Sequence, residues 1–151
     1  MKRIGSRIAA VALVAAAVLS FVAAEAPWSI EVRGVRGSST VSAPVTADVA
    51  ASLGSVEMKL EQKGVTKLYK GTPFAALVGL VDDADRKTFN ESLWTKGYAV
   101  TLTAKDGYAA TFDTAGVKPA DVMLALSADG AAIAPMVVGN IAKNLWVKDL
   151  A

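Results

Sequence analysis

Residues 98–112, YAVTLTAKDGYAATF, form the stretch of sequence that decides the fold. Residues 98–104 alternate in side-chain character with a period of two, which is typical of a strand with one buried face. The tripeptide KDG at 105–107 predicts a tight turn, because glycine readily adopts the positive φ that a three-residue hairpin loop needs. Residues 108–112 resume the apolar face, so the whole stretch predicts a β-hairpin.

The same alternation predicts further strands on both sides of this hairpin. A nearly continuous apolar run, VMLALS at 122–127, is typical of a strand that is buried on both faces. The predicted strands outside the hairpin are 28–33, 56–61, 65–69, 122–127, 132–138 and a closing strand at 145–150.

Short helices are predicted between these strands, at 47–53, 73–81 and 86–94. Thr46 is suited to cap the first helix, and Thr72 is suited to cap the second, with Pro73 at its first position. Apolar residues at 74, 77, 78 and 81 would give the second helix one buried face. The fold class is therefore predicted as α+β, with mixed or antiparallel β-sheets and a few short helices.

Three aspartates, Asp82, Asp83 and Asp85, follow the second predicted helix. They could bind a hard cation, or they could leave one helix and cap the next, because carboxylates favour a helix N-terminus. No further oxygen ligands follow at calcium-loop spacing, so the sequence favours the capping interpretation and no metal ligands are assigned.

The first 24 residues have the features of a secretory signal peptide. A basic start precedes an apolar run at 8–22, and small residues follow at the positions that signal peptidase reads. An uncleaved membrane anchor is the alternative, but the run is shorter than the roughly 20 residues of a membrane span. We therefore expect a signal peptide at 1–24 and a single domain at 25–151, exported to the periplasm or secreted, with no membrane span after cleavage.

Composition excludes several classes of function. Residues 25–151 keep 13 of the 16 basic residues against all 14 acidic ones, a net charge of −1. Without a basic stripe, nucleic acid is not an expected partner. The chain has no cysteine and no histidine, which removes disulfides, thiolate chemistry, the commonest metal ligand and the commonest general base.

Four pieces of sequence, in this order, resemble the oxidoreductase molybdopterin-binding domain, which is the fold of the sulfite oxidase family. They are YKGTPFAAL at 69–77, DGY at 106–108, VMLALSADG at 122–130 and WVK at 146–148. The resemblance extends from about residue 28 to residue 151, and it implies the fold of that domain.

The sequence departs from this family at its metal centre. In the family's enzymes a cysteine thiolate binds molybdenum, but the corresponding region, LEQKG at 60–64, has no cysteine. The insertion that carries cofactor contacts is missing, and the basic start is not a twin-arginine signal, the usual export route of loaded enzymes. These departures predict a retained fold without molybdenum chemistry, so no cofactor is expected, and only the resemblance would imply molybdopterin.

Two groups of residues are the candidate binding site. The resemblance implies that the hairpin tip lies near the pterin cleft and that the C-terminal group lies where the family's enzymes have phosphate contacts. The alternative for the tip is that Asp106 only makes the turn and Tyr108 only anchors it. The candidates are Lys105, Asp106 and Tyr108 at the tip and Lys143, Asn144 and Lys148 near the C-terminus.

The sequence leaves several functions open and assigns no catalytic residue. The first is a non-catalytic module that binds a small ligand or an envelope protein partner. The second is a molybdopterin-dependent oxidoreductase or a cofactor-binding redox subunit. The third is a structural accessory of an envelope system.

Overall fold

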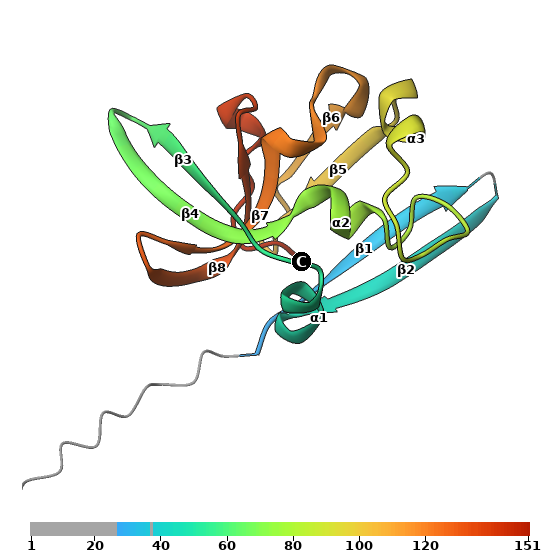
Figure 1. Cartoon of the computed structure of the whole chain (residues 1–151), viewed down its shortest axis with the longest axis horizontal. Coiled ribbons are helices and arrows are strands. Elements are labelled where there is room, and N and C mark those ends of the chain that lie inside the picture. Colours follow the sequence, from blue (N-terminus) through green and yellow to red (C-terminus); the bar gives the residue numbers. More distant parts are fainter. Residues whose placement is uncertain (1–26, 37) are drawn as a thin grey trace, which may run out of the picture.

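The structure, a computed structural model, describes residues 27–36 and 38–151. The predicted signal peptide, 1–24, and its cleavage site lie outside the described residues. Eight strands in the described ranges form three antiparallel sheets, with orders β1-β2, β3-β4-β7-β8 and β5-β6 (Figure 1). The strands are β1 (Ser29–Arg36), β2 (Ser39–Thr46), β3 (Val56–Gln62), β4 (Val65–Pro73), β5 (Ala99–Thr103), β6 (Ala109–Asp113), β7 (Val122–Ala128) and β8 (Ala131–Gly139).

The helices between the strands are short, none longer than six residues in the described ranges. The coarse prediction of antiparallel sheets with a few short helices is therefore confirmed. The α-helices are α1 (Ala47–Ser52), α2 (Phe74–Val78) and α3 (Glu91–Lys96), and the 3₁₀ helices are η1 (Thr114–Gly116), η2 (Pro119–Asp121) and η3 (Lys143–Leu145).

The hairpin predicted at 98–112 is present as β5 and β6. The Ala104 amide donates to the Tyr108 carbonyl oxygen at 2.8 Å, and Gly107 has a φ of 87°, as the turn requires. One detail differs from the prediction. Tyr108 is 49% exposed. Its side chain leaves the apolar face at the loop and reaches towards Asn144 in the C-terminal segment, residues 143–151.

β7 is buried on both faces, as its apolar run predicts. It lies between β4 and β8 in the four-stranded sheet. Val122 and Leu124 pack into the larger apolar cluster, whereas Met123 and Ala125 pack into a smaller cluster on the opposite face. The alternation of the pleat therefore gives each face its own core.

Trp94 lies at the centre of the larger cluster, with 1% of its surface exposed. Four aromatic rings surround it with centroid separations of 5.6–6.4 Å, and its indole N–H donates to the Val117 carbonyl oxygen at 2.6 Å. The surrounding rings are Phe74, Phe89, Tyr98 and Phe112.

The sequence did not predict β2, the strand that pairs with β1 along its whole length. Gly34 and the serines that follow it indicate a loose loop, yet Gly34 lies inside β1. A side chain at this position would overlap the Val81 carbonyl oxygen. The glycine therefore permits a close approach of two backbones rather than a loop.

The predicted N-terminus of the second helix was wrong. β4 continues to Pro73, and the Thr72 hydroxyl is buried and donates to the Ala50 carbonyl oxygen at 3.0 Å. Pairing with β7 outweighs the local capping preference of the Thr-Pro pair. The buried face of this segment is confirmed, since the side chains at 74, 77, 78 and 81 are all buried.

The helix predicted at 86–94 begins later, because Asn90 and not an aspartate caps α3. The aspartates instead order the preceding loop through local hydrogen bonds. Asp85 accepts from the Thr88 hydroxyl at 2.6 Å, and Asp82 accepts from the Asn90 amide at 2.7 Å. No group of residues suited to a metal ion occurs in the part of the chain that the structure describes.

The closing strand predicted at 145–150 is reduced to two isolated bridges, Val137 with Val147 and Ala104 with Leu150. The 3₁₀ helix η3 occupies the start of this segment, and Asp149 has a φ of 49°. These conformations break the extended pattern that a ladder needs. The segment therefore connects β8 to the β5–β6 hairpin rather than extending a sheet.

Candidate functional site

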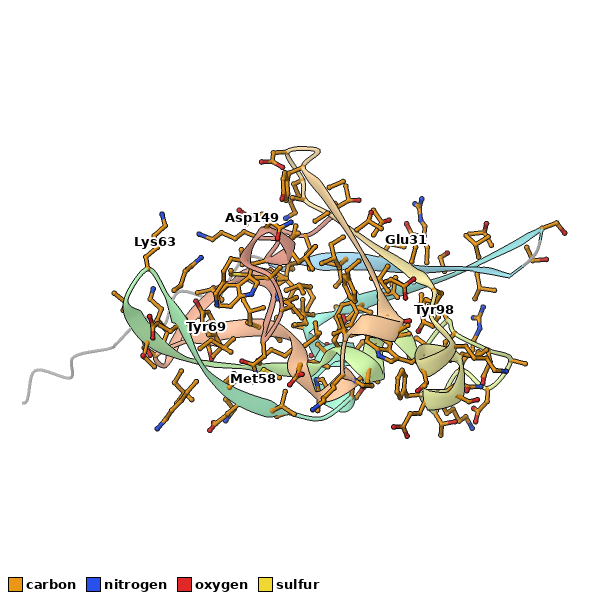
Figure 2. All side chains as sticks on the ribbon, turned by 90° about the horizontal axis from the view of Figure 1, so that it is seen from above. Glu31, Met58, Lys63, Tyr69, Tyr98 and Asp149 are labelled. Carbon is orange, nitrogen blue, oxygen red and sulfur yellow. The ribbon has the colours of Figure 1, made fainter. Side chains whose placement is uncertain are left out.

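A cleft of about 570 Å³ lies between the tip of the β5–β6 hairpin and the C-terminal segment, and we call it the tip cleft. Asp149 lies beside the hairpin, as Figure 2 shows. The cleft is lined by Ala104, Lys105, Asp106, Tyr108, Trp146, Lys148 and Asp149.

Hydrogen bonds fix the two walls of the tip cleft to each other. The Lys105 amide donates to the Asp149 carbonyl oxygen at 2.8 Å. The Tyr108 hydroxyl donates to the Asn144 carbonyl oxygen at 2.8 Å, and the Tyr108 amide donates to Asp106 Oδ1 at 2.9 Å. The loop and the C-terminal segment therefore form one ordered rim.

Trp146 contributes an aromatic wall to the cleft. Its indole N–H donates to the Gly139 carbonyl oxygen at 3.2 Å, and its ring meets Tyr69 edge-on at a centroid distance of 5.8 Å. Lys143 Nζ lies 3.5 Å from the centroid of the Trp146 ring. This cation–π contact holds a positive charge at the edge of the site.

The structure brings the six predicted site residues together. Four of them line the tip cleft, Asn144 supplies the carbonyl oxygen that Tyr108 binds, and Lys143 packs on Trp146. Tyr108 does anchor the loop, through its hydroxyl, while keeping half of its ring exposed at the cleft. Ala104, Trp146 and Asp149 are the lining residues that sequence reasoning did not select as site residues.

Three lysines at or beside the tip cleft have no ion-pair partner among the described residues. The ion pairs among the described residues join Arg33 to Glu31 and Lys70 to Glu57, so none of them involves a cleft lysine. Lys105 and Lys148 line the cleft together with Asp106 and Asp149, and the exposed Lys143 packs on Trp146 beside it. Unpaired ammonium groups at an open cleft suit an anionic ligand.

A second and larger hollow, of about 900 Å³, lies between β1 and β5, and we call it the β1–β5 groove. Residues 30–35 line one side and residues 98–103 line the other, with Phe74, Leu77 and Leu124 also in its lining. Sequence reasoning missed this groove, because it arises where two separate hairpins meet. The alternation at 98–104 was the one pattern that bears on this groove. It predicts a strand, but it does not predict that β1 lies beside that strand.

Two buried polar atoms in the β1–β5 groove have no hydrogen-bond partner among the described residues. They are Asp82 Oδ1 and the hydroxyl oxygen of Tyr98. Burial raises the pKa of Tyr98 to about 12, and the negative charge of Asp82 adds to the shift. Two residues that line the groove therefore each have a polar atom buried beneath its surface without a hydrogen-bond partner.

We expect stability at alkaline pH to depend on Tyr98. The unfolded phenol loses its proton near pH 10, whereas the folded one keeps it to about pH 12. The folded state then holds the extra proton, so the free energy of unfolding falls as the pH rises between these values. Urea unfolding at pH 9 to 11.5 should show a shallower fall for Tyr98→Phe than for the wild type.

Tyr108→Phe is the control for this titration, because it removes an exposed, hydrogen-bonded hydroxyl. At neutral pH it should lower the free energy of unfolding by about 1 kcal/mol, whereas Tyr98→Phe should be neutral or stabilising, since it removes an unpaired hydroxyl. Equal pH dependence of Tyr98→Phe and the wild type would contradict the assignment.

No protein-family model matches the chain, and no curated protein matches it. Within the described residues, no helix has both the length and the apolar character needed to cross a membrane.

Proposed function

We propose that this chain is an exported, non-catalytic binding module that holds a small anionic ligand in the tip cleft. The observation that carries the proposal is an open cleft lined by two lysines without ion-pair partners among the described residues, Lys105 and Lys148, with a third, Lys143, packed on the neighbouring Trp146 ring. The resemblance to the molybdopterin-binding domain supports the same location, because in that family this end of the fold faces the cofactor.

A molybdenum centre of the family's type does not fit the residues present. The chain has no cysteine to provide the thiolate ligand and no histidine to contact the cofactor. The groups around the tip cleft are ammonium, carboxylate, phenol and indole, a set that binds anions and stacks on flat rings. We therefore propose a relative of that domain that keeps the fold and binds a ligand without redox chemistry.

Binding of inorganic pyrophosphate, measured by calorimetry at low ionic strength, tests the proposal. Replacing Lys105, Lys143 and Lys148 together with glutamine should raise the dissociation constant about tenfold, because each exposed charge contributes roughly 0.5 kcal/mol. The affinity of the wild type should also fall with added salt.

The matched control is the triple variant Lys59→Gln, Lys87→Gln, Lys118→Gln, which removes the same charge from exposed positions outside the cleft. It should bind pyrophosphate as the wild type does. Equal loss of affinity in both triple variants would show that net charge alone attracts the anion, and it would overturn the cleft as the site.

Elemental analysis of protein purified from its own host separates this proposal from the oxidoreductase alternative. A binding module of the proposed kind should contain molybdenum far below one atom per chain. Near-stoichiometric molybdenum, together with turnover of sulfite or a sulfoxide, would overturn the non-catalytic function in favour of a cofactor-dependent redox protein.

A further inference from the structure

We propose that the β1–β5 groove accepts an extended strand of a partner protein, and that this strand carries a lysine or arginine that reaches Asp82 and Tyr98. The added strand would join the two small sheets into one continuous sheet with the order β2-β1-partner-β5-β6. This surface is separate from the tip cleft, and the proposal does not depend on the ligand proposed there.

Each side of the groove has a backbone edge without a strand partner. Among the described strands, β1 pairs with β2 alone and β5 pairs with β6 alone. The lining contains consecutive residues on both sides, 30–35 and 98–103, so the groove follows both strands along their length. Exposed edges of this kind bind extended peptides through main-chain hydrogen bonds.

The hydrogen bonds of the hairpin show which groups of β5 face the groove. The Tyr98 carbonyl oxygen accepts from Thr114, and the Ala104 amide donates to Tyr108, so even-numbered residues bond to the β6 side. In an antiparallel pair the alternate residues direct their N–H and C=O groups the other way. Ala99 and Thr101 therefore present their main-chain groups to the groove.

The C-terminal segment already pairs with this edge of β5 at one end. Ala104 and Leu150 form an antiparallel bridge, and the Ala151 amide donates to the Thr103 carbonyl oxygen at 3.0 Å. Both Leu150 and Ala151 line the groove. The outer edge of β5 is thus oriented to receive an antiparallel strand, and the partner strand would occupy the rest of it.

The chemistry of the groove defines the partner strand. Its lining includes the apolar side chains of Phe74, Leu77 and Leu124, which suit alternate apolar residues of the strand. At the Tyr98 end, Asp82 Oδ1 and the Tyr98 hydroxyl lack hydrogen-bond partners among the described residues. Figure 2 shows Tyr98 beside the hairpin and Glu31 on β1. The lining at this end also includes the carboxylates of Asp82 and Asp83, which have no ion-pair partner among the described residues, so an ammonium or guanidinium group of the strand would complement their charge.

Fluorescence anisotropy with a defined peptide tests the proposal. The probe is a labelled eight-residue peptide that alternates valine and threonine and has a lysine near its C-terminal end. The purified wild-type chain should bind it. A second peptide, N-methylated at alternate residues so that it cannot donate along one edge, should bind at least tenfold more weakly.

Two proline variants locate the binding edge. Thr101→Pro removes an N–H that faces the groove, whereas Thr111→Pro removes one from the opposite residue of β6, on the far edge of the same hairpin. Both should fold, which melting curves check. The first should weaken binding at least tenfold, and the second should leave it unchanged.

Asp82→Asn tests the charge contact separately. Asparagine keeps an oxygen for the bond from the Asn90 amide. This variant should weaken binding of the lysine peptide about fivefold and leave binding of a norleucine peptide unchanged. An equal effect on both peptides would overturn the proposed pairing with Asp82.

Amide hydrogen exchange gives a readout that does not depend on any variant. The peptide should slow exchange at Ala99 and Thr101 at least tenfold and leave Val100 and Leu102 unchanged, because their amides already face β6. Absence of binding, binding without this protection, or equal binding by the two proline variants would overturn the proposal. Protection of Ala99 and Thr101 in a peptide-free dimer would assign the groove to a second copy and overturn it as well.

Discussion

Replacing Trp94 with alanine should lower the free energy of unfolding by about 4 kcal/mol, within the range known for large aromatic residues in protein cores. The indole is almost completely buried and contacts four aromatic rings. The variant also leaves the Val117 carbonyl oxygen without the donor that it has in the wild type. Since small domains have only about 5–15 kcal/mol of stability, urea unfolding should show a much lower midpoint.

Trp28→Ala is the control, because it removes the same side chain from a partly buried position at the edge of the larger cluster. No ring contact of Trp28 occurs among the aromatic pairs of the described residues. Trp28→Ala should lower the free energy of unfolding by less than half as much as Trp94→Ala does. Equal losses would show that the centre of the core has been assigned to the wrong aromatic residue.

Gly71→Ala should lower the free energy of unfolding by roughly 3 kcal/mol, at the upper end of the usual effect of overpacking. A Cβ at this position would overlap the Leu124 carbonyl oxygen and would lie 2.9 Å from the Ala125 Cα. Both neighbours are backbone atoms of β7, which cannot move without loosening the central pairing between β4 and β7. The ladder also shifts register between Lys70 and Gly71.

Gly116→Ala is the matched control for this substitution. No atom outside the chain neighbours lies within 4 Å of a Cβ at position 116, and its φ is not positive. We expect a change of less than about 1 kcal/mol, with stabilisation through reduced freedom of the unfolded chain. If Gly116→Ala lowered the free energy of unfolding as much as Gly71→Ala, the result would contradict the close approach of β4 and β7.

Local patterns in the sequence predicted the elements that one strand or one turn can specify by itself. The alternation at 98–112 predicted β5 and β6, and the apolar run at 122–127 predicted a strand buried on both faces. Thr46 does cap α1, through a weak hydrogen bond of 3.4 Å to the Val49 amide. These features depend on neighbouring residues, so the sequence contains the information directly.

The prediction failed where a contact distant in sequence determines the local structure. Thr72 has the sequence context of a helix cap, but its hydroxyl bonds to Ala50 and its backbone pairs with β7. Gly34 looks like a loop residue, but it is the point where β1 approaches Val81. Patterns among neighbouring residues contain no information about partners that are distant in the sequence. Contacts with those partners outweigh the intrinsic preference of a residue for a helix cap or a loop.

The same distinction applies to the site. The six predicted residues do lie together, because the hairpin tip and the C-terminal segment are joined by hydrogen bonds from Lys105 to Asp149 and from Tyr108 to Asn144. The β1–β5 groove was missed, since it requires two hairpins to face each other across the core. Tyr98 was assigned to the strand by its alternation, and nothing in the sequence indicates that its hydroxyl would be buried without a partner.

The order of the strands has a consequence for the kinetics of folding. Four of the five ladders among the described strands join strands that are consecutive in the chain, and only the β4–β7 ladder joins distant ones. Forming this ladder closes a loop that spans residues 74–121, which is entropically less favourable than closing a hairpin. Substitutions at the β4–β7 ladder should therefore slow refolding, whereas substitutions in β1 or β2 should mainly accelerate unfolding.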